Sequence, residues 1–392
     1  MITRLQGLRR ILGTVILVSL FSSCVEPIEI QTETYENALV IEGTITDELS
    51  HQEILISRTY KLGETGPSRE SNATVRVTGN STLYEFIEEE PGRYLSIQPF
   101  RAEQGISYTL EIRTADGKQY SSEPEELPVS SNISALYAQK TTYEEETGVA
   151  ILAGVEVSQA ASGYYLYDFV ETYKIVSPYQ INLDLKVIDG EFVEVEKTRE
   201  ETVCYTTEVS KEVILANTNA QSGNDLEANL IKFIPGESHK TAHRYSILVR
   251  QFSISAETYS YYQTLRDFSE SENLFSQNQL GLINGNIFSI SDPDEPVVGI
   301  FSVAGVSRKR IFFNFEDFYD RDDFIPNAHV ECEVLFPPTL TRSQRESIGE
   351  QLKVGSLKYF GFEMGGGYRF AKAGCLDCTK YGSNIAPDFW EE

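Results

Sequence analysis

Short segments in which apolar and polar residues alternate fill the first third of the sequence and constrain its fold more than any other feature. Alternation with a period of two places the apolar side chains on one face of a β-strand. Such segments lie at residues 39–45, 53–59, 73–78, 83–87, 92–97, 108–113 and 118–122. Their regular spacing predicts a β-sandwich over residues 37–124, either Ig-like or transthyretin-like.

The rest of the chain predicts a second strand-rich domain over residues 130–392. Strand-like segments recur at 149–157, 164–170, 191–196, 245–252, 297–303 and 310–315. A helix is expected near residues 255–269, where Ser255 can cap the N-terminus and an apolar stripe follows at helical spacing. A second helix is expected from about residue 341 to 352. The expected fold class is therefore mainly β, with one or two helices.

The N-terminus has the three parts of an export signal over residues 1–23. Arginines come first, an apolar run follows at residues 11–21, and the signal ends in two serines before Cys24. The run is too short to span a bilayer, which takes about 20 residues, and it fits a removable signal. Small residues leading into a cysteine resemble a bacterial lipobox, so we expect lipid on Cys24 and an acidic tether at 24–36. An ordinary secretory signal is the alternative.

The formal net charge of −26 restricts the partners of the chain. A polypeptide with so large an acidic excess repels the phosphates of nucleic acids and anionic lipid headgroups. Nucleic acid is therefore not expected as a partner.

Four cysteines remain once Cys24 is assigned to lipid, namely Cys204, Cys332, Cys375 and Cys378. An even number in an exported chain favours disulfides, although four thiols allow three connectivities. Two of the four have the Cys-x-x-Cys spacing of metal and redox motifs. Zinc would need a second such pair or a suitably spaced pair of histidines, and the sequence offers neither.

The sequence predicts no catalytic residues, no metal and no cofactor. His239 and His243 have the spacing of a helical metal pair, but they lack the glutamate of the HExxH motif and follow a Pro-Gly turn. We interpret them as solvated loop residues. The acidic segment 316–323 does not match a calcium-binding loop, and glycines 365–367 are not followed by the Lys-Ser/Thr of a phosphate-binding loop.

Segments along most of the mature chain carry a resemblance to a known family. They lie at 39–43, 116–122, 245–255, 259–262, 282–287, 292–295, 299–303, 309–313, 375–379 and 387–390. Together they resemble a family of Bacteroidota outer-membrane lipoproteins, defined by domain of unknown function 4249 and often encoded beside TonB-dependent receptors. The resemblance implies outer-membrane lipid and a TonB-dependent β-barrel receptor as partners. It implies neither catalytic residues nor a ligand.

These observations favour a lipid-anchored accessory or binding protein of the outer membrane, working with such a receptor on a ligand that stays unknown. Its aromatic-rich second domain is the expected binding region, since tyrosines combine apolar faces with a polar tip. The alternatives are a structural or adhesive envelope lipoprotein with no transport role and, last, an envelope enzyme. Acids behind Cys24 resemble surface-export signals and favour exposure at the cell surface. The periplasmic face is the alternative.

Overall fold

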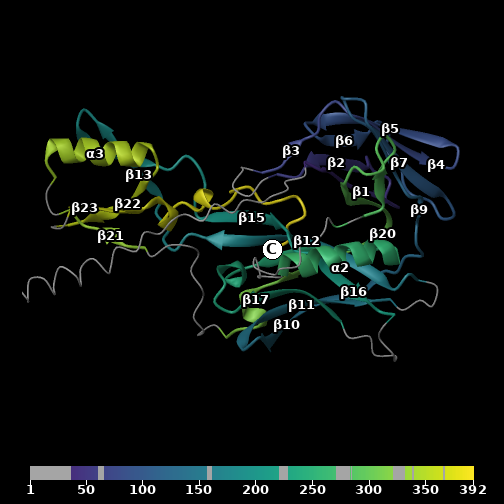
Figure 1. Cartoon of the computed structure of the whole chain (residues 1–392). Coiled ribbons are helices and arrows are strands. Elements are labelled where there is room, and N and C mark those ends of the chain that lie inside the picture. Colours follow the sequence, from purple (N-terminus) through teal and green to yellow (C-terminus); the bar gives the residue numbers. More distant parts are fainter. Residues whose placement is uncertain are drawn as a thin grey trace, which may run out of the picture.

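The computed structural model describes residues 37–60, 66–156, 161–219, 228–270, 283, 285–320, 332–337, 340–364 and 367–392. The expected leader 1–23, Cys24 and the tether 24–36 lie outside these residues. Figure 1 shows a mainly β molecule, as predicted, with helices α2 (Ala256–Glu270) and α3 (Arg342–Lys353). No helix in the described part of the chain is long and apolar enough to cross a membrane.

Every strand predicted before residue 124 is present, because each buries alternate residues in one core. The seven predicted strands are β1 (Leu39–Thr46), β2 (Glu53–Arg58), β4 (Thr74–Gly79), β5 (Thr82–Glu90), β6 (Arg93–Ser96), β7 (Ser107–Arg113) and β8 (Gln119–Ser122), and the structure adds the short strands β3 (Ser68–Arg69) and β9 (Glu125–Glu126). Buried Ile41, Ile54, Val77 and Leu110 illustrate the pattern. A β-sandwich is consistent with this arrangement.

Two later strands complete this first sheet. Strand β20 (Val297–Phe313) runs parallel to β1, and β19 (Ile287–Ser289) pairs with β8 at the far end. The Asn286 side chain joins these ends, accepting from the backbone N–H of Phe301 at 2.9 Å and donating to its carbonyl at 2.7 Å. The sheet thus curls around its core. That core contains residues of the expected unit 37–124 and also residues 287–303, far beyond it.

Gly299 allows β20 to lie against β1. Its φ is +128°, and a Cβ there would lie 1.8 Å from the carbonyl oxygen of Ile41. We expect Gly299→Ala to lower the free energy of unfolding by at least about 2 kcal/mol, since the backbone strain and the steric clash add. Urea denaturation measures this loss. Gly117→Ala is the control, because Gly117 also has a positive φ, of +93°, but a Cβ there would have no neighbouring atom within 4 Å. Equal losses for both variants would contradict the close approach of β20 to β1.

The second half of β20 continues into a second layer. There it pairs with β18 (Tyr245–Ser253), which is followed by β12 (Tyr164–Val176), β15 (Val203–Val209) and β16 (Ile214–Asn217). A three-stranded sheet of β10 (Ile133–Tyr143), β11 (Glu146–Val155) and β17 (Asn229–Pro235) packs against it around a shared core. Helix α2 contacts β12, β16 and β20. One long strand therefore contributes to both cores.

A smaller lobe lies at one end of the molecule (Figure 1). It contains α3, β13 (Leu183–Ile188), β14 (Glu191–Glu196), β21 (Val334–Leu335), β22 (Leu357–Glu363) and β23 (Gly367–Lys372). Its core includes Leu185, Phe192, Tyr359 and Phe370. Thr341 caps α3 and accepts from the backbone N–H of Gln344, which confirms the second expected helix. Short 3-10 helices η1 (His239–Thr241), η2 (Phe315–Asp317), η3 (Ala373–Cys375) and η4 (Cys378–Lys380) complete the described structure.

Glu125 is buried beside the N-terminus of α2. Burial and the nearby Glu257 raise its pKa to about 7, against the lowering effect of hydrogen bonds from Asn286 and Ser255. A raised folded-state pKa stabilises the fold at low pH, and that contribution is lost as pH rises from about 4.5 through about 7. We expect the free energy of unfolding of Glu125→Gln to exceed that of the wild type by about 2 kcal/mol at pH 8 and by little at pH 5. Urea denaturation at the two pH values tests this; exposed Glu126→Gln is the control, and a matching gain there would contradict it.

Candidate binding groove and its disulfide-linked base

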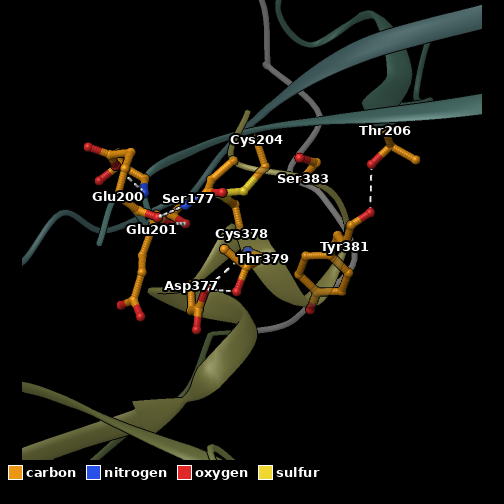
Figure 2. Close-up of a disulfide and its surroundings, with 12 residues drawn as sticks. Ser177, Glu200, Glu201, Cys204, Thr206, Asp377, Cys378, Thr379, Tyr381 and Ser383 are labelled. Carbon is orange, nitrogen blue, oxygen red and sulfur yellow. Dashed lines mark hydrogen bonds between the residues drawn. A yellow bond between two sulfur atoms is a disulfide. The ribbon is translucent and has the colours of Figure 1, made fainter. Parts of the chain in front are cut away.

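The four remaining cysteines form two disulfides, as expected. Cys204 on β15 bonds to Cys378 in η4, and Cys332 bonds to Cys375 in η3, with Cα–Cα distances of 5.6 and 5.7 Å. The Cys-x-x-Cys pair thus does not close on itself, and each member reaches a different distant segment. Figure 2 shows the first bond, which fixes the C-terminal segment to the second layer.

A buried ionic cluster lies beside the first disulfide, and Figure 2 shows two of its acids, Glu201 and Asp377, near Cys378. Lys358 of β22 places its Nζ 2.7 Å from Glu201 and 3.6 Å from Asp377, while Arg199 bonds to both acids at 2.9 and 2.8 Å. Burial alone would raise the pKa of Glu201, but hydrogen bonds from Lys358, Lys197 and Arg199 outweigh it and lower the pKa to about 2. The cluster therefore holds the lobe to the second layer, with Glu201 ionised at neutral pH.

Lys358 also lines a groove of about 570 Å³ in the lobe. The wall formed by β13 includes Asp184, Leu185, Lys186, Val187 and Ile188, which come from both faces of the strand. Because neighbouring residues of a strand point to opposite faces, a cavity that touches all of them runs along the strand's edge. The opposite wall is α3, which contributes Glu346, Gly349, Glu350, Leu352 and Lys353.

A second ionic cluster ties the two sheets of the larger core together. Glu171 on β12 accepts hydrogen bonds from Lys232 at 2.6 Å, from Lys240 at 2.8 Å and from the hydroxyl of Tyr245. Lys240 also bonds to Glu208 at 2.6 Å. Each of these groups has a partner, so the cluster fits a structural role. Neither cluster nor the groove was expected from the sequence, since no local motif marks them.

The other residues considered as sites do not assemble into one. His239 lies in η1 and His243 follows it, outside an α-helix as expected, but both are half-buried rather than fully exposed. His239 makes an edge contact with Tyr173, with ring centroids 5.5 Å apart. Glu316 and Asp317 belong to η2, and residues 321–323 and 365–366 lie outside the described chain. Among the residues with described positions, no group of His, Cys, Asp or Glu could hold a metal ion.

Comparison with known proteins identifies one family. No curated protein matches the chain. The solved structure of the adhesin InvE from Yersinia pseudotuberculosis matches 55% of this chain at 11% identity and a TM-score of 0.14, and the match spans 54% of the adhesin's chain. The model of a domain of unknown function, DUF4249, matches residues 25–310, from the residue after Cys24 into β20. The chain therefore belongs to the DUF4249 family.

Proposed function

We propose that this protein is a lipid-anchored accessory or binding protein of the outer membrane that works with a TonB-dependent receptor. The lipobox-like end of the leader supports the anchor, through lipid on Cys24. The resemblance to lipoproteins encoded beside such receptors supports the partner. Bacteroidota, in which that arrangement is found, is the proposed source.

The groove in the lobe is the observation that carries the binding role. Its volume of about 570 Å³ falls in the range of small-ligand sites, roughly 300–1,000 Å³. Its lining combines apolar Leu185, Val187 and Leu352 with several charged side chains. Both walls pack on the core of the lobe, to which Leu185 of β13 and Leu352 of α3 belong, so the groove is formed before a ligand arrives. A preformed site loses less conformational entropy on binding.

A crosslinked pull-down from intact cells tests the proposal. The tagged wild-type chain is expected to capture a β-barrel receptor, and Cys24→Ala is the control that keeps every described residue but removes the lipid acceptor. Recovery of the wild-type chain alone would reject the receptor role. A deletion strain with normal uptake but altered attachment would favour the structural or adhesive alternative.

Mass spectrometry of the purified N-terminus tests the anchor by itself. The expected product begins at Cys24 and carries acyl chains, each buried CH₂ of which contributes about 0.8 kcal/mol to membrane binding. An unmodified Cys24, or an uncleaved leader, would reject the anchor.

A further inference from the structure

We infer that the groove takes an extended strand of another polypeptide, which adds to the free edge of β13. This inference rests on the proposed function, in which the groove is the binding site, and it names the class of ligand. Adding a strand to an exposed sheet edge is a recurrent mode of peptide recognition, because the backbone supplies affinity and the side chains supply selectivity.

The turn after β13 determines which backbone groups face the groove. Asp189 and Gly190 form a two-residue turn with φ of +50° and +82°, which is the signature of a type I′ hairpin. The flanking residues, Ile188 and Glu191, then form a hydrogen-bonded pair, and bonded and non-bonded pairs alternate along the ladder. Residues 183, 185 and 187 therefore direct their N–H and C=O groups away from β14.

That edge of β13 borders the groove. The groove is lined by β13 and by no residue of β14, so it lies on the side opposite β14. Within the described part of the chain, β13 pairs with no strand other than β14. The outward N–H and C=O groups thus present the donors and acceptors that an added strand requires, in a slot bounded by α3.

The two sides of β13 set the pattern of side chains in the added strand. Leu185 and Val187 face the core of the lobe, where Leu352 of α3 also lines the groove. Asp184 and Lys186 face the other side. An added strand points its own residues alternately to the same two sides. We therefore expect alternating apolar and polar residues over about six positions, the length of β13.

The charge of the whole chain favours a basic ligand. The lining itself is balanced, with three acids and three lysines, and Lys358 pairs with Asp184 at 3.7 Å. The chain around the groove carries a net charge of −26. Such a field attracts cations. The polar positions of the ligand are therefore expected to be lysine or arginine.

Fluorescence anisotropy with the full chain, purified in detergent, tests this inference. The probe is a labelled, end-capped peptide of alternating valine and lysine. A peptide of the same composition with the valines and lysines in two blocks is the control for pattern, and alternating valine and glutamate is the control for charge. The alternating basic peptide is expected to bind at least about tenfold more tightly than either control. Equal binding of all three, or no binding of any, would overturn the inference.

N-methylation of the peptide tests the backbone pairing directly. Two peptides are methylated on alternate backbone nitrogens, one on the even and one on the odd positions. In an added strand, one of them loses the N–H donors that face β13 and the other loses the donors that face away from it. One methylated peptide is expected to lose about tenfold in affinity and the other to stay near the parent. Equal affinity of the two methylated peptides would show that no strand is added.

Variants of α3 locate the peptide. Glu350→Trp is expected to fill the groove and weaken binding at least about tenfold, since the side chain is exposed and lines the cavity. Gln351→Trp is the matched control, because its neighbouring position is exposed but does not line the groove. Glu350→Gln separates loss of charge from filling. An unchanged affinity in Glu350→Trp would place the peptide elsewhere and overturn the inference.

The two hypotheses fail in different ways. Capture of a β-barrel from cells, together with absence of peptide binding, would retain the proposed function and reject strand addition. Peptide binding that Glu350→Trp abolishes, with no receptor captured, would retain strand addition and reject the receptor role.

Discussion

Replacing Cys204 and Cys378 with serine is expected to lower the free energy of unfolding by about 5 kcal/mol. The bond joins residues 174 positions apart, and a crosslink that closes so long a loop removes much conformational entropy from the unfolded chain. The bond between Cys332 and Cys375 closes a separation of 43 and is expected to contribute about 4 kcal/mol. Urea denaturation followed by circular dichroism measures both losses.

The paired variant of Cys332 and Cys375 is the internal control for this prediction, since it removes one crosslink and leaves the other. A larger loss from this shorter loop than from the longer one would contradict the chain-entropy argument. Hydrogen exchange should add a local effect. Without the bond to Cys204, amides of η4 and β22 are expected to exchange faster, because the bond fixes η4 to β15 and its loss leaves only non-covalent contacts there, the ionic cluster and backbone hydrogen bonds such as that from Cys378 to Glu201.

Glu171→Leu is expected to lower the free energy of unfolding by about 3–5 kcal/mol. Glu171 is 2% exposed, and its carboxylate neutralises Lys232 and Lys240 between two packed sheets. Removing one partner of a buried ionic group leaves the other charges uncompensated, and the desolvation already incurred is not recovered. Chemical denaturation at neutral pH measures the loss.

Asp168→Asn on the same strand is the matched control for Glu171. Asp168 pairs with Arg250 at 2.5 Å, but both side chains are partly in solvent, with exposures of 28% and 38%. Such pairs contribute less than about 1 kcal/mol. Similar losses for Glu171→Leu and Asp168→Asn would show that burial does not control the strength of these ionic contacts.

Local alternation predicted the strands of the first sheet well, because each strand there has one buried face. It could not predict the partner of β1. The apolar segment from Val297 to Ala304 is typical of a strand buried on both faces, but no local sequence feature predicts that it pairs with residues 39–46. The sequence also suggested two segments, at 297–303 and 310–315, where the structure has one strand from Val297 to Phe313.

The site was predicted only in part for a similar reason. Composition and the expected compartment predicted disulfides at all four cysteines, but the choice among three connectivities depends on which distant strands meet. Strand β13 was missed, although Leu183, Leu185 and Val187 alternate with polar or exposed residues. The groove depends on which edge of that strand lacks a partner, and edge exposure is a property of the assembled sheet.

The shared strand β20 bears on how the chain reaches its native state. A nascent chain ending near residue 124 contains every strand from β1 to β8 but neither of the two that meet at Asn286. Its sheet would stay open at both ends until synthesis passed residue 304, and open sheet ends invite wrong pairing. Folding is therefore not stepwise from the N-terminus, because the first core is completed only once β20 has been synthesised. Both cores are expected to unfold in a single thermal transition.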